Sequence, residues 1–431
     1  MKDNKISTDS YKGVRDFYPE DMFVLRYITD NMREVVESFG YQEYTASPLE
    51  PSELYQAKNS EEIVNEQTYN FIDRGGRSVT LRPEMTPTIA RMVAKKRRDL
   101  SLPIRLYSIP NVFRYEQPQR GRLREHYQLN VDIFGVKGVE AEIELITVGK
   151  KIMQSLKARD DDYEIRINSR KLFKLITKSL DLSDEVSLSL ARLLDKKEKL
   201  ERLDFETKLK ELIGHRAENL IRYINSQDLG TAIEYLDEKI LKSEAFKELE
   251  NLMLGLSSNG VSNAKFYPSL MRGFDYYTGI IFEFFDTNKE NNRSLFGGGR
   301  YDELMDIFGE EKIPTAGFGM GDVTAKDFLE THNLIPKYVS KTDLYICLFE
   351  DTPQDYVNNT ATELRKKGIN VAVDYSFRKL GDQIKSADKS KIKFVAIIGL
   401  EEARNKIVNL KNIQTGETYV CKLAEIANFI K

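Results

Sequence analysis

Cysteine is nearly absent from this chain of 431 residues, which holds only Cys347 and Cys421. The two cysteines form neither a CxxC pair nor a Cys/His cluster, which disfavours structural zinc and a disulfide scaffold. Histidine is almost as rare, with three residues, and His126 has no ligand partner at metal-binding spacing. We therefore expect no metal site built from protein clusters, and a protein of the reducing cytoplasm.

Long apolar runs and a large net charge are missing as well. No run of about 18 apolar residues occurs, and the N-terminal MKDNKISTDSYKG has no apolar signal-peptide core, so we expect neither export nor a membrane span. The net charge of −3 gives no overall basic field, so any polyanion must meet a local patch. From Ser340 onward the chain holds 15 Lys and Arg against 12 Asp and Glu, which makes this tail slightly basic.

The length is too great for one ordinary domain, and a composition of 41% hydrophobic and 31% charged residues suits several cores. A Leu/Lys/Glu-rich stretch of helical period, about 172–258, predicts a helical insertion inside a first domain of residues 1–335. After the polar connector THNLIPKYVSKTD, the buried-strand runs LYICLFE, NVAVDY and KFVAIIG alternate with helical segments. This alternation predicts a small α/β domain over 341–431.

Within the first domain, residues 20–40 have the apolar spacing of an amphipathic helix, and Gly40 stands where a C′ glycine belongs. The extended stretch YQEYTASP follows, and a block of strands separated by Gly and Pro is expected over 79–134. The segments IIFEFF and FGGGRYDELM again have the composition of strands.

The stretch FRYEQPQRGRLREHYQ, residues 113–128, places four arginines in a mildly acidic chain. We interpret it as a hairpin with QPQRG as its loop, and alternate side chains of a strand share one face. The apolar side chains of the second arm occupy odd positions from Leu123 to Ile133. The even positions of both arms carry polar groups, namely Arg114, Glu116, Arg122, Arg124, His126, Gln128, Asn130 and Asp132.

A solvated sheet face usually mixes Lys, Thr, Ser and Glu, whereas this polar face uses arginine and no lysine. Arginine is favoured where a planar, bidentate group must bind phosphate or carboxylate. The face therefore predicts a site for a triphosphate together with a polar small molecule.

FRYEQPQRGRLREHYQLNVDIFG resembles motif 2 of class II aminoacyl-tRNA synthetases, in the form found in the histidyl-tRNA synthetase family. Four further stretches resemble motifs of that family in the right order, namely YKGVRDFYP, TLRPEMTPTIAR, LMRGFDYYTGIIFEF and GGGRYDELM. The last two are specific to the histidyl branch, and the resemblance covers nearly the whole chain. The tail resembles the anticodon-binding domain shared by the histidyl, threonyl, prolyl and glycyl enzymes.

The resemblance implies an α+β fold, with an antiparallel class II sheet of six strands, helices, the helical insertion and the C-terminal α/β anticodon-binding domain. It implies that histidine and ATP form histidyl-adenylate and pyrophosphate on Mg²⁺. The histidyl group is then transferred to the 3′ end of histidine tRNA. The resemblance also implies a homodimer formed through the first helix–strand unit, which ends at Pro48.

The same resemblance assigns roles to single residues. Arg114 and Arg272 would be the catalytic arginines, which contact the α-phosphate as the histidine carboxylate attacks it. The tRNA acceptor end would meet Gln119 and Arg124. Histidine would be bound by Glu84, Thr86, Gln128, Asp132, Tyr277 and Tyr301. ATP would be bound by Arg114 together with Glu116, Arg122, His126, Gly319 and Gly321.

One position departs from the family pattern. Motif 3 of the family ends in an arginine that meets the γ-phosphate, and the matching position in GFGMGDVTAKDF is Thr324. Lys326 lies two residues further on, about 200° around a helix, so it would not simply substitute. Either Arg124, Lys326 or another cation takes over this contact, or the ATP chemistry is impaired.

Other interpretations stay open. A synthetase-like regulatory subunit of histidine synthesis would explain the missing arginine, although such proteins typically lack the tail and the special arginine of RGFDYYTG. A prolyl, threonyl or glycyl synthetase would share the tail, but RGFDYYTG and GGGRYD disfavour it. Tyr277 and Tyr301 could be core aromatics and Gln119 a solvated loop side chain, while His215 and His332 are expected on the surface.

Overall fold

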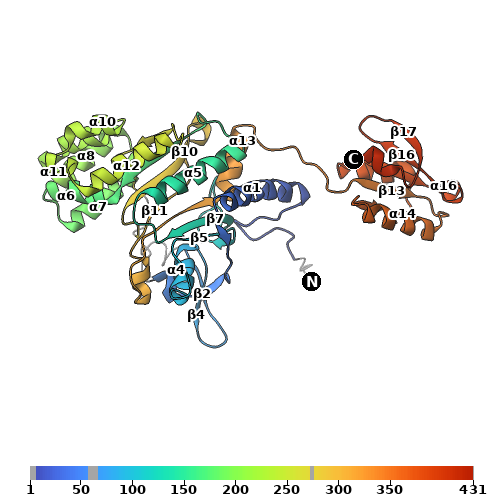
Figure 1. Cartoon of the computed structure of the whole chain (residues 1–431), viewed down its shortest axis with the longest axis horizontal. Helices are drawn as coiled ribbons and strands as arrows, with labels where there is room; N and C mark the ends of the chain where they lie inside the picture. Colours follow the sequence, from blue (N-terminus) through green and yellow to red (C-terminus); the bar gives the residue numbers. More distant parts are fainter. Residues whose placement is uncertain (1–5, 57–66, 272–275, 431) are drawn as a thin grey trace, which may run out of the picture. The chain divides into compact units, whose positions relative to one another are not determined.

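The computed structural model describes residues 6–56, 67–271 and 276–430. Two compact units, Met1–Ile335 and Pro336–Lys431, make up the chain (Figure 1). Each has a hydrophobic core of its own. Among the residues described, no helix has both the length and the apolar character that crossing a bilayer requires.

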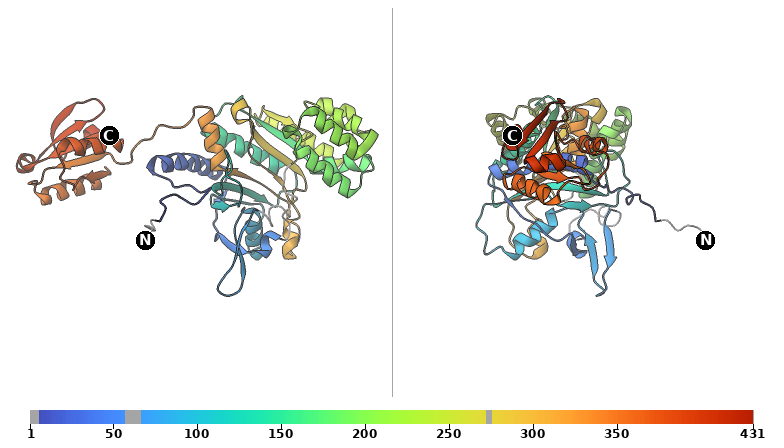
Figure 2. Two further views of the ribbon diagram at one scale, coloured as in Figure 1. Left: turned by 180° about the vertical axis from the view of Figure 1, so that it is seen from behind. Right: turned by 90° about the vertical axis from the view of Figure 1, so that its right-hand side faces the viewer.

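The described part of the first unit is built on a nine-stranded sheet (Figure 2). The order is β1-β5-β7-β12-β11-β10-β8-β9, and β6 pairs with β7. From β5 to β8 all neighbours are antiparallel, whereas β1 and β9 add parallel pairs at the edges, so the expected antiparallel class II sheet is confirmed. The strands are β1 (Gln42–Glu43), β5 (Ile104–Ser108), β6 (Asn111–Phe113), β7 (Glu125–Phe134), β8 (Tyr163–Ser169), β9 (Ala264–Phe266), β10 (Ile280–Asp286), β11 (Ser294–Arg300) and β12 (Thr315–Gly321).

Three helices share a core with one face of this sheet (Figure 1). They are α1 (Pro19–Ser38), α5 (Glu140–Ser155) and α13 (Asp322–Thr331). The first begins with a proline and two acidic residues, which suit the positive end of a helix, and Gly40 follows it with φ of +82°. The odd residues Leu129, Val131 and Ile133 of β7 are buried against these helices, which leaves its even residues for the opposite face.

A smaller sheet and the helices α2 and α4 lie before β5 in the chain. The sheet has the order β2-β4-β3, with β2 (Leu49–Pro51), β3 (Tyr69–Ile72) and β4 (Ser78–Leu81). The helices here are α2 (Glu53–Gln56) and α4 (Thr86–Lys95). The predicted block of strands over 79–134 was wrong in this part, because TPTIARMVAK forms α4, with Pro87 in its first turn.

The helical segment of the first unit lies between β8 and β9. Its helices bury their apolar faces in the same core as the large sheet. The α-helices are α6 (Arg170–Ser179), α7 (Asp184–Asp195), α8 (Arg202–Ile213), α9 (Ala217–Ile224), α10 (Leu229–Ala232), α11 (Glu238–Leu241) and α12 (Glu244–Ser258). Short 3-10 turns are η1 (Lys197–Lys199), η2 (Gly214–Arg216), η3 (Ile233–Tyr235), η4 (Lys289–Asn291) and η5 (Leu304–Phe308), the last two outside this segment.

The second unit is an α/β fold. Its described residues form a sheet in the order β14-β13-β15-β16-β17, of which β14, β13 and β15 are parallel. The antiparallel pair β16 and β17 was not foreseen from the sequence. The strands are β13 (Leu344–Leu348), β14 (Val371–Val373), β15 (Phe394–Ile398), β16 (Ile407–Asn412) and β17 (Thr418–Lys422). The helices are α14 (Gln354–Lys366), α15 (Leu380–Lys389), α16 (Leu400–Asn405) and α17 (Ile426–Ile430).

Candidate active site

A polar pocket lies on the face of the large sheet that α1, α5 and α13 do not cover. Strands β7, β11 and β12 contribute to it, together with the turn before α4 and the residues that precede β10. It brings together all six side chains predicted to bind histidine, and also Arg114 and Gly319. The lining residues are Glu84, Thr86, Arg114, Gln128, Asn130, Asp132, Tyr276, Tyr277, Gly297, Tyr301, Gly317, Phe318 and Gly319.

In the pairing of β7 with β12, glycines lie opposite the polar residues of β7 and leave space for their side chains. Asp132 is opposite Gly317, and Asn130 is opposite Gly319. A Cβ atom at Gly317 would collide with the carboxylate of Asp132, and one at Gly319 would collide with the amide of Gln128. Gly317 and Gly319 are therefore needed because side chains of the neighbouring strand occupy the space above them.

Asp132 has a carboxyl group whose pKa is strongly perturbed. Burial raises the pKa of its carboxyl group to about 7, the hydrogen bond from Tyr301 acts in the opposite direction, and the charge of Glu84 adds to the rise. Tyr301 donates that bond to Oδ1, whereas Oδ2 is buried without a hydrogen-bond partner in the described part of the chain. The second oxygen is thus available to a donor on a ligand.

Glu84 lies opposite Asp132 in the pocket and is held by a tyrosine. The Tyr276 hydroxyl donates to its Oε2 at 3.1 Å, and both residues are buried. Arg82, two residues earlier, fixes the turn by donating to the carbonyl oxygens of Ala46 at 2.8 Å and Asn111 at 2.9 Å. The carboxylate therefore has a defined direction before any ligand binds.

Tyr276 and Asn130 are pocket residues that were not among the predicted ligands. The rings of Tyr276, Tyr277 and Tyr301 form an edge-packed cluster, with centroids 5.0 to 6.3 Å apart. In the sequence, Tyr276 and Tyr277 are adjacent, and no periodic signal could say which of them reaches Glu84. The place of Asn130 on the pocket face agrees with its even position in β7. Its side-chain amide donates to the Gln128 carbonyl at 3.1 Å.

Arg114 and His126 extend the polar face toward the start of β7. Arg114 Nε donates to the Pro83 carbonyl at 3.0 Å, which ties the guanidinium to the turn before Glu84. His126 pairs with Val112 in the β6–β7 ladder. Burial lowers the pKa of its ring to about 3, and the charges of Arg114 and Arg15 add to this, so the imidazole is neutral at pH 7.

The remaining predicted residues of the hairpin lie in a loop, outside the lining of the pocket. The second arm becomes a strand only at Glu125, so alternation of faces does not apply to Arg122 and Arg124. Arg122 is exposed, with its guanidinium 3.6 Å from Glu116. Gln119 is also exposed and closes a turn with Arg122 through backbone hydrogen bonds of 2.9 and 3.0 Å.

Three predicted positions remain, namely Arg272, Thr324 and Gly321. Arg272 lies outside the described residues. Thr324 donates its hydroxyl to the Leu295 carbonyl at 2.7 Å, so it packs as a neutral residue. Gly321 borders both Thr324 and His126, whose nearest atoms would be 3.8 and 3.5 Å from an added Cβ.

His332 was expected on the surface, and that prediction was wrong. Its Nε2 is 3.0 Å from Asp286 Oδ1, its Nδ1 is 3.5 Å from Asp162 Oδ1, and its ring packs on Phe328. The side chain is 11% exposed. The sequence around His332 could not predict these partners, because Asp162 and Asp286 lie at or next to the ends of strands that are distant in the sequence. His215, in contrast, is exposed.

Comparison with known proteins decides the family. The family model for histidyl-tRNA synthetase matches residues 13–322, which is most of the chain. The chain belongs to the histidyl-tRNA synthetase family. A second family model, for an anticodon binding domain, matches residues 343–431. The resemblance seen in the five motifs is confirmed.

Single relatives agree with this membership. A histidine–tRNA ligase of Leptospira biflexa is 41% identical over 436 aligned residues, which cover 100% of this chain and 99% of that protein. The crystal structure of a histidyl-tRNA synthetase from Nostoc sp. PCC 7120 has a TM-score of 0.82 at 25% identity and covers 99% of both chains. An ATP phosphoribosyltransferase regulatory subunit/histidyl-tRNA synthetase from Bacillus halodurans C shares the fold, with a TM-score of 0.76 at 23% identity, over 92% of this chain and 99% of that chain.

Proposed function

We propose that this chain is a histidine–tRNA ligase, which activates histidine with ATP and transfers the histidyl group to the 3′ end of histidine tRNA. The observation that carries the proposal is the pocket itself, where the buried carboxylates of Glu84 and Asp132 and the buried Oε1 of Gln128 lie together with Arg114. Acceptors suit an imidazole and an ammonium group, and a guanidinium suits phosphate.

Histidine binding uses the acceptors of the pocket. The imidazole carries one or two N–H donors and the α-ammonium three, so the ligand needs several acceptors and at least one anion. Asp132 Oδ2 and Gln128 Oε1 are buried without hydrogen-bond partners in the described residues, and Glu84 supplies a second carboxylate. A ligand that lacks these donors would leave buried acceptors unpaired, which gives selectivity. We assign Thr86, Tyr277 and Tyr301 to the walls of this site.

Activation is an in-line displacement at phosphorus. A carboxylate oxygen of histidine forms a bond to the α-phosphorus of ATP, the bond to the bridging oxygen breaks, and pyrophosphate leaves with the electron pair. Arg114 stabilises the negative charge on the α-phosphate oxygens as the bonds change. The neutral ring of His126 and the backbone at Gly319 and Gly321 receive the adenosine, with Glu116 and Arg122 beside it. In the second step, the terminal ribose oxygen of the tRNA attacks the histidyl carbonyl, and AMP leaves.

The family resemblance also implies Mg²⁺. Among the described residues, no group of three or more His, Cys, Asp or Glu side chains is arranged to hold a metal ion. Mg²⁺ is usually held by one or two carboxylates together with the phosphates of its substrate, so the ion would bind together with ATP.

Transfer RNA would contact both units separately. In the first unit, the exposed loop with Gln119 and Arg124 is the candidate for the acceptor end. In the second unit, β13 and β14 are parallel neighbours, so their carboxyl ends meet at one edge of the sheet. Exposed aromatic side chains follow these ends, where they could stack on unpaired bases. They are Phe349, Tyr375 and Phe377, which are 41%, 54% and 43% exposed.

A homodimer is proposed through α1 and the segment that ends at Pro48. Near this segment, Tyr18 and Leu49 are 71% and 47% exposed, which suits an interface that a second copy would cover. Light scattering of the full chain would give its mass in solution, and a monomer at micromolar concentration would contradict this part of the proposal.

The deciding experiment is ATP–pyrophosphate exchange with each of the twenty amino acids. Exchange with histidine alone is expected, followed by histidyl-tRNA formation when tRNA is added. Exchange with another amino acid would replace the proposed substrate. Binding of histidine with no exchange would instead favour a regulatory subunit, the alternative that Thr324 supports.

A further inference from the structure

The segment Tyr11–Phe17 is seated against the loop that connects β6 and β7. The Gly13 carbonyl accepts a hydrogen bond from the Arg124 backbone N–H at 2.8 Å. Arg124 also donates to the Tyr11 hydroxyl at 3.2 Å. A Cβ at Gly13 would lie 2.8 Å from Cγ of Arg124 and Cγ of Pro118, so this position must be glycine, and its φ of +86° requires the same. These contacts of Gly13 fix where Arg15, two residues further along the chain, can reach.

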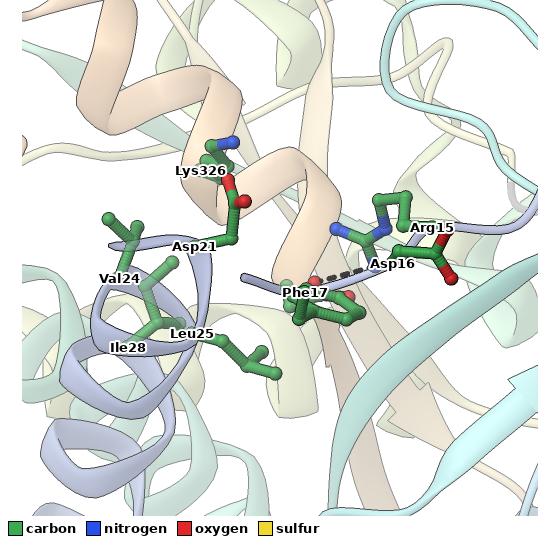
Figure 3. Close-up of a pocket in the computed structure, with 9 residues that line it drawn as sticks. Arg15, Asp16, Phe17, Asp21, Val24, Leu25, Ile28 and Lys326 are labelled. Carbon is green, nitrogen blue, oxygen red and sulfur yellow. Dashed lines mark ion pairs between the residues drawn. The ribbon is translucent and has the colours of Figure 1, made fainter. Parts of the chain in front are cut away.

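Arg15 reaches the point where β12 ends and α13 begins (Figure 3). Its Nη2 forms an ion pair of 2.8 Å with Oδ2 of Asp322, the first residue of α13. Oδ1 of Asp322 accepts the Tyr127 backbone N–H at 2.8 Å, which continues the β7–β12 ladder beyond its last strand pair. The Arg15 guanidinium also lies over the Phe17 ring, 4.7 Å from its centroid. It is therefore held beside β7 at the level of Tyr127.

The junction of β12 and α13 also borders the residues that we assign to ATP binding, His126 and Gly321. His126 precedes Tyr127 in β7, and its side chain borders Gly321, the residue before Asp322. The charges of Arg15 and Arg114 both lower the pKa of the His126 ring. Arg15 Nε is buried without a hydrogen-bond partner among the described residues, so this donor can still bind a ligand oxygen.

The cations predicted to compensate for Thr324 point elsewhere or are already engaged. Lys326 lines the same pocket next to α1 as Arg15 and Asp322, on the side of Asp21 (Figure 3). Its Nζ is 3.7 Å from Glu330. Arg124 donates to the Glu116 carbonyl at 3.1 Å and lies over the Tyr115 ring, 4.1 Å from its centroid. Arg114 and Arg272 are assigned to the α-phosphate, so the terminal phosphates of a triphosphate with about four negative charges need a further cation.

We propose that Arg15 binds the terminal phosphates of ATP, the part that leaves as pyrophosphate, and that Asp322 is the residue that positions it. The inference rests on the proposed function, because it assigns a residue to the ATP subsite of that reaction. One donor of the guanidinium is bound to Asp322, and the remaining donors provide the planar, forked group that suits phosphate. The second step of the reaction no longer involves these phosphates, so it does not need Arg15.

The test replaces Arg15 with glutamine and compares it with an arginine in a similar pair. Arg91 is the matched control, because its Nη2 is also 2.8 Å from a buried carboxylate, that of Glu50. In R15Q, the KM for ATP in histidine-dependent exchange is expected to rise about tenfold or more. The KM for histidine, and the single-turnover rate of transfer from preformed histidyl-adenylate to tRNA, should stay within about twofold. R91Q should change none of these.

Equilibrium binding separates this inference from the proposed function. R15Q should bind ATP about tenfold more weakly than the wild type and AMP equally well, whether or not exchange occurs. Equal weakening of ATP and AMP, or parallel loss of exchange and transfer, would show that Arg15 only neutralises Asp322 and would overturn the inference. Wild-type protein that binds ATP without histidine-dependent exchange would end the proposed function alone. Wild-type protein that does not bind ATP would end both.

Discussion

The Tyr301 hydroxyl donates a hydrogen bond to Oδ1 of Asp132 at the floor of the pocket, and both side chains are buried. Tyr301 is itself fixed, because its backbone N–H donates to the Thr315 carbonyl at 2.8 Å. One oxygen of the carboxylate is therefore used for orientation, and the other is presented to the ligand. Asp132 therefore presents one oxygen to the ligand in a fixed direction.

Histidine should bind more tightly as pH rises through about 7. Burial raises the pKa of Asp132 to about 7, so below this pH its carboxyl group is neutral, and above it the group is an anion that accepts hydrogen bonds from N–H donors. Calorimetric titration from pH 6 to 8 should show the Kd falling with pH. D132N should bind at least tenfold more weakly and lose this dependence. A dependence that D132N retains would assign the titration to the histidine ligand instead.

The same pKa shift has a consequence for stability. Because the folded-state pKa of Asp132 is raised, its contribution to stability is fully present below the unfolded value of about 3.9 and is lost as pH rises through about 7. Bound histidine offsets this loss by pairing with the anion. The increase in melting temperature that histidine causes should therefore be larger at pH 8 than at pH 6.

The parity of β7 shows what the sequence could predict and where it stopped. Gln128 and Asp132 lie on the pocket face as predicted, because a side-chain period of two holds once the strand begins at Glu125. Arg122 and Arg124 were assigned by the same rule but lie in a loop, where the rule has no physical basis. Tyr276 was missed because its contact with Glu84 depends on the path of a turn, which periodicity does not encode.

A methyl group at Gly319 should close part of the pocket. The Cβ of an alanine would collide with the Gln128 amide, which is the far end of a flexible side chain, so the strand can stay paired while Gln128 is displaced. G319A is therefore expected to fold and to bind histidine at least tenfold more weakly. G321A is the matched control, because its Cβ would make only an ordinary contact of 3.5 Å with His126. Equal histidine affinity in both variants would show that Gln128 is not a ligand.

His332 should stabilise the first unit through its two aspartate partners. Asp286 is fully buried, so removal of the imidazole takes away one hydrogen-bond partner of a desolvated carboxylate. H332F retains ring packing on Phe328 and is expected to lower the stability of this unit by about 1–3 kcal/mol. H215F, at an exposed position, should change it by less than about 0.5 kcal/mol. Urea unfolding followed by circular dichroism gives both values, and equal midpoints would contradict the assignment.

The exposed aromatic residues after β14 should contribute to tRNA binding. Phe377 has φ of +51°, a conformation that is strained for a bulky residue and that persists only where its surroundings hold it. Here Gln383 holds the loop, since its amide donates to the Arg378 carbonyl at 2.7 Å while its Oε1 accepts the Leu348 N–H at 2.9 Å. The exposed ring of Phe377 is thus held in a fixed position, although its backbone conformation is energetically unfavourable. This combination favours a role in binding.

F377A is accordingly expected to raise the KM for tRNA about tenfold in aminoacylation, as for the loss of one base-stacking contact of about 1–3 kcal/mol. Histidine-dependent pyrophosphate exchange should be unchanged, because this reaction does not involve tRNA. Phe429 offers a control of similar exposure, 38%, in the same unit, where it packs on Tyr419 away from the carboxyl ends of β13 and β14. If F377A and F429A change the KM for tRNA to the same extent, the edge formed by β13 and β14 is not where this unit meets RNA.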